Sequence, residues 1–374
     1  MIPFNKPYAT GLELQYIQEA IQAGQTAGNG QFTKRCQKWL EDTTGTHKAL
    51  LTHSCTAALE MCAILAGIEP GDEVIMPSYT FVSTANAFVL RGGVPVFVDV
   101  EPSCLNVDPS KIEAAITERT KAIVVVHYAG VGCDMNAILE IANARGIIVI
   151  EDAAQGALAS YEGRALGTMG SLGALSFHET KNIISGEGGA LLINDAELAE
   201  RAEIVWEKGT NRSAFFRGDV DKYTWVDVGS SFLPGEVVAA FLWAQFESAR
   251  SITDRRLEIW RRYHDAFAAA EADGRVRRPI IPDGRVHNAH MYYVLAESLD
   301  VRTNVIKRLR DDGYMAVFHY VPLHSSPAGK RFGRTSGSLE HTDDLSARLV
   351  RLPLWVGIDD ATVDAIAAAV LDVV

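Results

Sequence analysis

Short apolar runs alternate with amphipathic segments through residues 49–150 of this 374-residue chain. The runs at 94–98, 122–127 and 147–150 are rich in valine and isoleucine, and the segments between them have helical apolar spacing. A strand that is apolar on both faces has to be covered on both faces. The pattern therefore predicts an α/β protein, in which a mostly parallel sheet is sandwiched between helices.

The second half of the chain departs from this alternation. We expect a long irregular loop at 207–232, a helical stretch from 235 to about 265, and a domain edge in the proline-containing stretch 273–283. The tail then predicts a smaller α+β domain, with strands at 291–295 and 316–320 and helices at 303–311, 339–350 and 360–373. We place a large domain at residues 1–248 and a small C-terminal domain at 249–374.

Polar residues follow the strands of the predicted sheet. Ligands of parallel sheets bind outside the carboxyl ends of the strands, so 54–56, Phe81, His127, Asp152 and Lys181 are expected near one edge. The hydroxylated residues at 54–56 precede a helical run at 59–66, where free backbone N–H groups suit a phosphate. A plain helix cap would explain the same residues.

Lys181 and Asp152 carry the chemical hypothesis. Lys181 follows a short apolar segment and precedes the glycine-rich turn 186–189, a setting in which a desolvated amine can form a Schiff base. Asp152 ends the apolar run that begins at 149. A lysine that forms a Schiff base and a carboxylate that pairs with a pyridinium nitrogen are the groups that pyridoxal 5'-phosphate requires. Taken alone, a lysine such as Lys181 is more often a solvated surface residue.

Composition narrows the class of protein. The net charge of −12 argues against nucleic acid or an anionic membrane surface as the main partner. The opening residues 1–7 contain two prolines and no apolar run is long enough to span a bilayer, so we expect a cytoplasmic protein without a membrane partner. Five cysteines without a C-x-x-C pair indicate neither a disulfide framework nor a metal site.

Six motifs, in this order, resemble those of one enzyme family. The chain resembles the nucleotide-sugar aminotransferases of the DegT/DnrJ/EryC group, which use pyridoxal 5'-phosphate and have fold type I, over essentially its whole length. The motifs are Ser-Cys-Thr-Ala-Ala-Leu at 54–59, Pro-Ser-Tyr-Thr-Phe-Val-Ser-Thr-Ala-Asn at 77–86, His-Tyr-Ala-Gly at 127–130, Glu-Asp-Ala-Ala-Gln at 151–155, Ser-Phe-His-Glu-Thr-Lys-Asn at 176–182 and Gly-Glu-Gly-Gly at 186–189.

The resemblance implies a role for each site residue. Lys181 would form the Schiff base with the cofactor and then move the proton, and Asp152 would pair with the protonated ring nitrogen. Gln155 would bond the phenolic oxygen of the cofactor, and Phe81 would lie on the face of its ring. The phosphate would be held by a further set: Cys55, Thr56, Ala57 and Ser176.

Three further segments, at 207–213, 221–231 and 317–329, are similar to enzymes that aminate C4 of dTDP-4-keto-6-deoxy-D-glucose. Their implied product is dTDP-4-amino-4,6-dideoxy-D-galactose, with L-glutamate as donor and 2-oxoglutarate as coproduct. This implies dTDP-sugar biosynthesis for lipopolysaccharide or enterobacterial common antigen. A C3-keto substrate or another stereochemistry stays open, because composition and spacing do not reveal the carbon, the face or the nucleotide.

Other residues have more than one interpretation. Many relatives carry Asn-Tyr-Arg at the position where this chain has Ser231 followed by Phe-Leu. In those relatives the Asn reaches the cofactor phosphate of the neighbouring subunit. The resemblance therefore implies a homodimer or a larger homo-oligomer with a cross-subunit active site. His127 would line the pocket or transfer a proton. The candidates for contact with the sugar nucleotide, each with a structural or surface role as the alternative, are Tyr320, His324, Arg212 and Lys222.

Competing functions fit the sequence less well. In the related sugar dehydratases a histidine replaces the Schiff-base lysine, and Lys181 argues against that branch. A non-catalytic regulator of the same fold would have no reason to keep Lys181, Asp152 and Gln155 together. A nicotinamide-dependent oxidoreductase lacks support because no G-x-G-x-x-G follows a strand.

Overall fold

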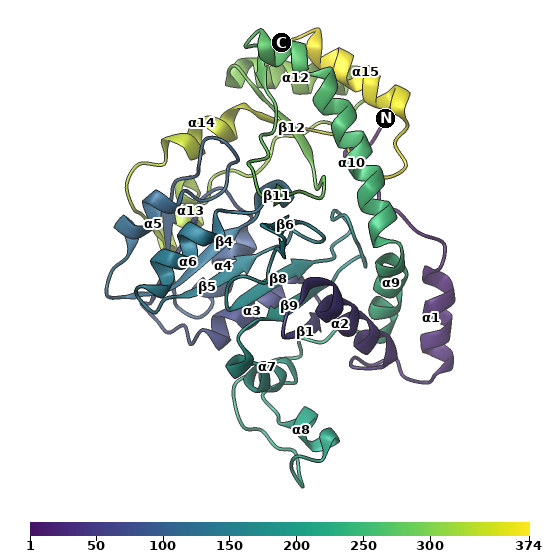
Figure 1. The fold of residues 1–374 in the computed structure, drawn as a ribbon, viewed down its shortest axis with the longest axis vertical. Coiled ribbons are helices and arrows are strands. Elements are labelled where there is room, and N and C mark those ends of the chain that lie inside the picture. Colours follow the sequence, from purple (N-terminus) through teal and green to yellow (C-terminus); the bar gives the residue numbers. More distant parts are fainter.

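The computed structural model describes residues 1–374, and an eight-stranded sheet forms its centre (Figure 1). The spatial order of the strands is β1-β9-β8-β5-β4-β2-β3-β13. Their bounds are β1 (Lys48–Thr52), β2 (Glu73–Pro77), β3 (Val94–Val98), β4 (Thr120–Val126), β5 (Ile148–Asp152), β8 (Leu172–Ser176), β9 (Gly189–Ile193) and β13 (Arg334–Thr335). Only β9 runs antiparallel to its neighbours. The mostly parallel sheet predicted from the sequence is confirmed.

Helices cover both faces of this sheet because both faces are apolar. In β4, Ile123 and Val125 belong to one buried cluster, whereas Ala122 and Val124 belong to the other. The helices of the first cluster are α1 (Glu13–Gln22), α2 (Gln31–Thr44), α5 (Pro109–Ala115), α6 (Met135–Asn143) and α9 (Glu236–Glu247). Those of the second are α3 (Cys55–Leu65), α4 (Val82–Val89) and α7 (Ala199–Trp206). Alternate side chains of each strand thus enter separate cores.

A second core lies at the C-terminal end of the chain, at the top of Figure 1. A three-stranded antiparallel sheet, in the order β10-β12-β14, packs there against three helices. The strands are β10 (Val276–Arg277), β12 (Tyr292–Ala296) and β14 (Leu349–Leu352), and the helices are α10 (Ala249–Ala266), α12 (Leu299–Asp311) and α15 (Asp360–Leu371). An α+β unit of this kind was expected in the tail.

The remaining elements are short. They are β6 (Ser160–Tyr161), β7 (Arg164–Ala165), β11 (Arg285–Val286), α8 (Arg212–Arg217), α11 (Ala268–Ala272), α13 (Pro327–Phe332), α14 (Glu340–Arg348), and the 3₁₀ turns η1 (Tyr128–Gly130), η2 (Ala196–Leu198) and η3 (Leu323–Ser325). None of the helices has the length and apolarity to cross a bilayer.

The two cores are joined by a third buried cluster and by chain crossings. Tyr293 of the small sheet packs with Tyr79 and Tyr128 of the large unit. Residues 323–345 return to the large sheet, where β13 pairs with β3. At the other end of the chain, Ile2 pairs with Tyr314 and packs on the C-terminal core. The division at 248/249 stays a prediction, and it coincides with a break between two helices at Ser248.

The helical stretch expected at 235–265 consists of two helices, α9 and α10, because Ser248 leaves the helical conformation. Three other expectations differ from the structure. The loop 207–232 contains the short helix α8. The expected strand at 316–320 is a single bridge between Val317 and Arg351, beyond which side-chain hydrogen bonds hold the chain toward the large unit. The helix expected at 339–350 ends at Arg348, and the next residues form β14.

Glu73 ties the C-terminal part of the chain to the edge of the large sheet. Its side chain is fully buried at the start of β2, and Arg334 of β13 donates to both carboxylate oxygens, at 2.9 and 2.7 Å. Arg119 donates at 2.6 Å and the Thr117 hydroxyl at 2.8 Å. A buried carboxylate is stable only when such donors surround it.

Arg334→Gln should lower the free energy of unfolding by about 1–3 kcal/mol, because it removes the bidentate partner of a buried charge while Arg119 and Thr117 remain. Urea unfolding of the variant measures this loss. Arg310→Gln on the exposed face of α12 serves as the control and should unfold like the parent chain. An unchanged midpoint for the Arg334 variant would show that the pair contributes nothing to stability.

Candidate active site

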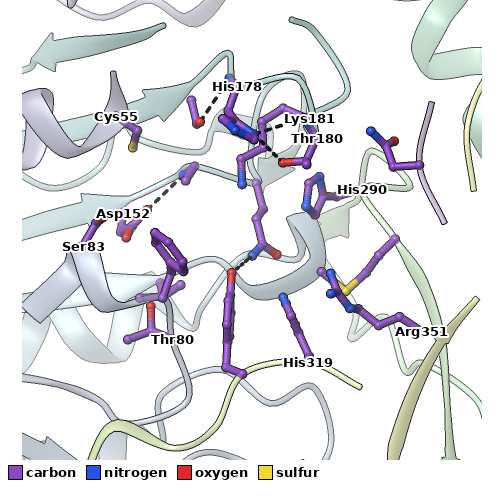
Figure 2. Close-up of a pocket in the computed structure, with 18 of the residues that line it drawn as sticks. Cys55, Thr80, Ser83, Asp152, His178, Thr180, Lys181, His290, His319 and Arg351 are labelled. Atoms are coloured by element: carbon purple, nitrogen blue, oxygen red, sulfur yellow. Dashed lines mark hydrogen bonds between the residues drawn. The ribbon is translucent and has the colours of Figure 1, made fainter. Parts of the chain in front are cut away.

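A cavity of about 800 Å³ lies where the carboxyl ends of β5 and β8 face the small sheet. Figure 2 shows Cys55 and Asp152 on one side of it and His319 and Arg351 on the other, with Lys181 between them. Eight residues that we singled out from the sequence line this cavity: Cys55, Thr56, Phe81, Asp152, Gln155, Ser176, Lys181 and Tyr320. The strand ends therefore gather these side chains at one edge of the sheet, as expected for a parallel sheet.

Asp152 is the last residue of β5 and is buried in the cavity wall. Its Oδ2 accepts a hydrogen bond from Thr84 Oγ1 at 2.7 Å, and its Oδ1 accepts one from the Ala154 N–H at 3.1 Å. Burial raises the pKa of Asp152, and the hydrogen bond from Thr84 opposes that rise. Both donors are neutral, so the charge of this carboxylate is not compensated by them and a cationic ligand could pair with it.

Lys181 lies on the connection between β8 and β9, which are neighbouring antiparallel strands. Its N–H donates to the His178 carbonyl at 2.9 Å within a tight turn. Burial lowers the pKa of the Lys181 amine. A larger fraction of this amine is therefore unprotonated at neutral pH than in an exposed lysine, and the unprotonated amine is the nucleophile and the base.

The first turn of α3 faces the cavity beside these residues. Ser54 caps the helix, since its Oγ accepts from the Ala57 N–H at 3.1 Å, and Thr56 and Ser83 share a hydroxyl hydrogen bond of 2.8 Å. Cys55 and Thr56 are the first two residues of the helix, and such N–H groups have no partner within a helix. Gly189 packs against this turn so closely that a Cβ on it would lie 2.5 Å from the Cys55 nitrogen.

Gln155 and the two rings beside it form another wall. Gln155 accepts from the Ala129 N–H at 2.6 Å and donates to the Tyr320 hydroxyl at 3.0 Å. Phe81 is 55% exposed, and its ring centroid lies 6.1 Å from that of Tyr320. An exposed phenyl group at a cavity mouth can cover a planar ligand and exclude water.

Six other residues named from the sequence lie outside the cavity wall: Ala57, His127, Arg212, Lys222, Ser231 and His324. The Ala57 N–H is occupied by the cap of α3. His324 shares a hydrogen bond of 2.8 Å with Ser78. Arg212 contacts Glu207 at 3.3 Å, in the arm 207–232 at the bottom of Figure 1 that also carries the exposed Lys222 and Ser231.

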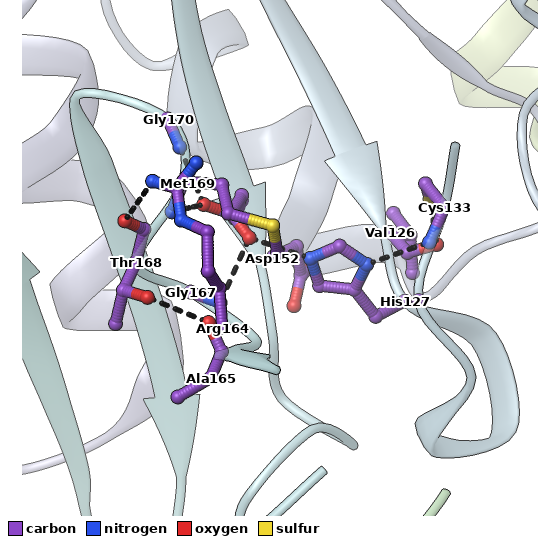
Figure 3. A network of polar contacts seen from close by, with 12 residues as sticks. Val126, His127, Cys133, Asp152, Arg164, Ala165, Gly167, Thr168, Met169 and Gly170 are labelled. Carbon is purple, nitrogen blue, oxygen red and sulfur yellow. Dashed lines mark hydrogen bonds and ion pairs between the residues drawn. The ribbon is translucent and has the colours of Figure 1, made fainter. Parts of the chain in front are cut away.

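His127 is buried beneath the site in a polar network (Figure 3). Its Nε2 donates to Glu151 at 2.8 Å, and its Nδ1 accepts from the Cys133 N–H at 3.1 Å. Glu151 also accepts three backbone N–H groups of the turn before β8, those of Gly167, Met169 and Gly170, at 2.8, 2.5 and 2.6 Å. The ring thus faces the core, although it stands at a strand end as expected.

Several cavity residues were not identified from the sequence. Among them are Arg256, His290 and Arg351. Thr84, which lies outside the cavity wall and donates to Asp152, was not singled out either. Arg256 lies in the stretch that was expected to be helical, and Arg351 follows the helix that was expected to end at residue 350. Only the pairing of β14 with β12 brings Arg351 to the cavity, and a single sequence does not reveal that pairing.

A model of the DegT/DnrJ/EryC1/StrS aminotransferase family matches residues 7–371. The chain belongs to this family. The resemblance noted in the sequence is confirmed at that level, and the protein is a sugar aminotransferase of this group.

Curated relatives in this family cover nearly the whole chain. The spore coat polysaccharide biosynthesis protein SpsC of Bacillus subtilis is 34% identical over 100% of this chain and 97% of its own length. A dTDP-4-dehydro-2,3,6-trideoxy-D-glucose 4-aminotransferase of Saccharopolyspora spinosa is 30% identical over 98% and 95%. A UDP-4-amino-4-deoxy-L-arabinose–oxoglutarate aminotransferase of Shewanella sediminis is 30% identical over 100% and 98%.

Solved structures of family aminotransferases have the same fold. The aminotransferase TlmJ of Streptoalloteichus hindustanus superposes with a TM-score of 0.90 at 32% identity, over 99% of this chain and 98% of its own. The putative sugar aminotransferase Spr1654 of Streptococcus pneumoniae, in its PMP form, gives 0.89 at 26% identity over 100% and 99%. The fold is therefore that of the fold type I aminotransferases, as predicted.

The cofactor of this sugar aminotransferase is pyridoxal 5'-phosphate. The residues present fit that group. Asp152 is a buried carboxylate with only neutral donors, and a protonated ring nitrogen would supply its missing counter-charge. The first turn of α3 offers N–H groups and hydroxyls to a phosphate, and Lys181 lies in the same cavity.

Glu151→Gln should destabilise the aminotransferase by about 2–4 kcal/mol, because an amide cannot accept all four of these hydrogen bonds. Burial favours protonation of Glu151, but the hydrogen bonds from His127 and the backbone outweigh it and leave its pKa below the ordinary value. The stability that this lowered pKa confers is present above the ordinary pKa of a glutamic acid and is lost as pH falls through the folded-state value.

Urea unfolding of both chains from neutral to acid pH measures this difference, which should shrink in acid. The exposed Glu113, which pairs with Arg145 at 2.8 Å, provides the control Glu113→Gln. A difference that stays constant with pH would contradict an ionised Glu151.

Proposed function

We propose that this chain transfers the amino group of L-glutamate to C4 of dTDP-4-keto-6-deoxy-D-glucose. The products would be dTDP-4-amino-4,6-dideoxy-D-galactose and 2-oxoglutarate. The observation that carries the transaminase part of the proposal is the placement of Lys181 and Asp152 in one cavity with the first turn of α3. An amine that forms a Schiff base, a buried carboxylate and a phosphate subsite are what such an enzyme needs.

Asp152 would hold the ring of the bound cofactor through its nitrogen, and Thr84 fixes the orientation of this carboxylate. The cofactor, when bound, supplies the electron sink that makes an α-proton acidic and carries the amino group between donor and acceptor. Cys55, Thr56 and Ser176 would hold its phosphate. Gln155 would donate to its phenolic oxygen through the N–H that Tyr320 leaves free.

Lys181 would move the proton in both halves of the reaction. Its amine would take the α-proton of glutamate and later deliver a proton to the sugar carbon. The lowered pKa of the buried amine suits this task, because the unprotonated form is the one that accepts a proton. Phe81 would exclude water above the reacting atoms, which protects the intermediate stage from hydrolysis.

The substrate assignment is supported by sequence segments and by the relatives. The segments 207–213, 221–231 and 317–329 are similar to enzymes for this dTDP-linked 4-keto sugar, and a relative from Saccharopolyspora spinosa is named as a dTDP-sugar 4-aminotransferase. The Shewanella relative is named for a UDP sugar and oxoglutarate, which favours glutamate as donor. A C3-keto substrate or another stereochemistry is the alternative. Use of the product in lipopolysaccharide or enterobacterial common antigen, and a cytoplasmic location, belong to the same proposal.

We also propose a homodimer with a cross-subunit active site. The arm 207–232 projects from the large unit and exposes large apolar side chains, among them Trp225 at 79% and Phe216 at 68% (Figure 1). Such a surface favours burial against another chain. Ser231, Arg212 and Lys222 of this arm would then approach the partner's cofactor and sugar nucleotide. Light scattering that gave the mass of one chain would contradict this assembly.

The visible spectrum of the reconstituted holoenzyme tests the reaction in two stages. Glutamate should remove the visible absorption of the bound cofactor, and dTDP-4-keto-6-deoxy-D-glucose should restore it. NMR of the product then gives the carbon and the stereochemistry. If glutamate removes the absorption but this sugar does not restore it, the substrate assignment is wrong and the transaminase assignment stands. UDP-linked and 3-keto sugars would then test the alternative substrates.

Lys181→Ala should abolish turnover, with a loss of at least about 10³-fold, because both proton transfers and the Schiff-base nucleophile depend on this amine. Steady-state formation of 2-oxoglutarate measures the loss. Lys307→Ala, on the exposed face of α12 and outside the cavity, gives a control that still contains every cavity residue. Sustained amination of the sugar by the Lys181 variant would contradict the assignment.

A further inference from the structure

One histidine of the cavity wall has no part in the roles proposed above. His290 stands two residues before β12, and Figure 2 shows its ring in the same region of the cavity as Lys181. The ring nitrogen Nδ1 lies 3.1 Å from Oδ1 of Asn182, the residue that follows Lys181 in the chain. His290 is therefore tied to the turn that carries the reacting lysine.

The contact with Asn182 determines which ring nitrogen of His290 carries the hydrogen. The Nδ2 of Asn182 donates to the Asn288 carbonyl at 2.7 Å, so the amide oxygen is the atom that faces the ring. An amide oxygen can only accept, and Nδ1 of the imidazole is then the donor. In a neutral ring the other nitrogen, Nε2, keeps a free lone pair. His290 thus offers a hydrogen-bond acceptor to the cavity.

Hydrogen bonds hold the backbone of the segment 288–290 in place. The Nδ2 of Asn288 donates to the carbonyls of Gln155 and Ala157, both at 2.8 Å. The buried Arg256 of α10 donates to the carbonyls of the next two residues, from Nε at 3.1 Å and from a terminal nitrogen at 2.7 Å. The position of the imidazole is thus set by several elements rather than by a free loop.

The conformation of Ala289 shows that this position is imposed on the chain. Its φ is +49°, in the left-handed region, which costs free energy in any residue other than glycine. Strained backbone persists only where its surroundings hold it, and it is concentrated at functional sites. The strain immediately before His290 therefore favours a role for this ring in the reaction.

The charges around His290 keep its ring neutral. Burial lowers the pKa of His290 well below the ordinary value of a histidine, and the charges of Lys181 and Arg256 lower it further. A neutral imidazole among cations can accept a hydrogen bond from them but does not repel them. The other groups whose ionisation acts on His290 or on Lys181 are Cys55 of α3, Asp152 of β5, His319 and Arg351 of β14.

We infer that His290 positions the amine of Lys181, because its Nε2 accepts a hydrogen bond from that amine whenever the amine is not joined to the cofactor. This inference rests on the proposed transaminase function, in which the same amine takes and delivers a proton. The lysine has a flexible four-carbon stem, so a released amine can move away from the reacting carbon. An acceptor in a fixed place limits that motion and keeps the proton transfer in reach.

A hydroxyl group of the sugar could also donate to Nε2. The lysine is favoured because the other nitrogen of the same ring is bonded to Asn182, so the ring and the lysine turn keep one relative position. The test separates these two donors.

The test compares the parent holoenzyme with His290→Asn, His290→Gln and the exposed control His47→Asn. The short amide of asparagine can donate to Asn182 as Nδ1 does, but it does not extend to the position of Nε2. The longer amide of glutamine can place its oxygen there. The first variant therefore removes the acceptor, and the second restores it.

Two kinds of measurement are made on each protein. Glutamate first converts the holoenzyme to the form in which Lys181 is free, and acetylation of this amine by acetic anhydride is then followed by mass spectrometry against pH, which gives the pKa of Lys181. Rapid mixing gives the maximal rate and the half-saturating concentration for glutamate and for the keto sugar. Thermal unfolding verifies that the variants are folded.

We expect a lower pKa of Lys181 in His290→Asn than in the parent enzyme. The hydrogen bond to Nε2 stabilises the ammonium form, and without it the effect of burial is less opposed. The maximal rates of both half-reactions should fall by about tenfold or more, the usual effect of losing a hydrogen bond to a charged group. The half-saturating concentrations should change by less than about threefold, as for a surface substitution. His290→Gln should recover most of both losses, and His47→Asn should match the parent enzyme.

Three results would overturn the inference. An unchanged pKa of Lys181 in His290→Asn would show that the amine does not bond to the ring. A higher half-saturating concentration of one substrate, with that pKa unchanged, would assign Nε2 to the substrate. Equal losses in His290→Asn and His290→Gln would show that the ring acts by packing alone.

The parent enzyme distinguishes this failure from a failure of the proposed function. If glutamate does not change the visible spectrum of the parent holoenzyme, the proposed donor is wrong, and the positioning role of His290 falls with it. If the parent responds to glutamate and the variants give one of the three results above, only the role of His290 is wrong.

Discussion

Two adjacent carboxylates at the end of β5 point to opposite sides, and the site depends on this alternation. Glu151 turns into the core, where His127 and three N–H groups of the turn 167–170 surround it. That turn leads directly into β8, whose far end leads to Lys181. Asp152 turns into the cavity. The dipeptide Glu151–Asp152 therefore holds the start of β8, which leads to Lys181, and also supplies the carboxylate that faces the cavity. The same two residues affect the stability of the fold and the geometry of the site.

The reversed strand β9 adds a second constraint. Because β8 and β9 are hydrogen-bonded neighbours, the segment with Lys181 is held at both ends, with Ser176 opposite Gly189. Gly189 also has no room for a side chain beside the first turn of α3. The first turn of α3 and the segment that carries Lys181 are thus coupled through one glycine. Packing alone therefore accounts for a glycine at position 189.

Many of the site residues could be predicted from the sequence because the end of a strand can be recognised from the few residues around it. Asp152 and Lys181 follow apolar runs, and the rule for parallel sheets places such residues together. Arg351 could not be found in this way. The run 349–352 is too short for periodicity to separate strand from helix, and its partner β12 lies more than fifty residues earlier. For His127, the sequence indicated the position at a strand end but not the direction of the side chain. That direction depends on the hydrogen bond to Glu151.

The cavity has two walls that belong to different cores. Lys181, Asp152 and the first turn of α3 are attached to the eight-stranded sheet, whereas Arg351 is attached to the small sheet. The two cores meet at the cluster around Tyr79, Tyr128 and Tyr293 and at the chain crossings described above. Units with separate cores can rotate relative to each other more easily than either core can deform. A rotation of this kind would change the distance from Arg351 to Lys181 but not the distance from Lys181 to Asp152. The mutual geometry of Lys181 and Asp152 would therefore be independent of how the two units are placed.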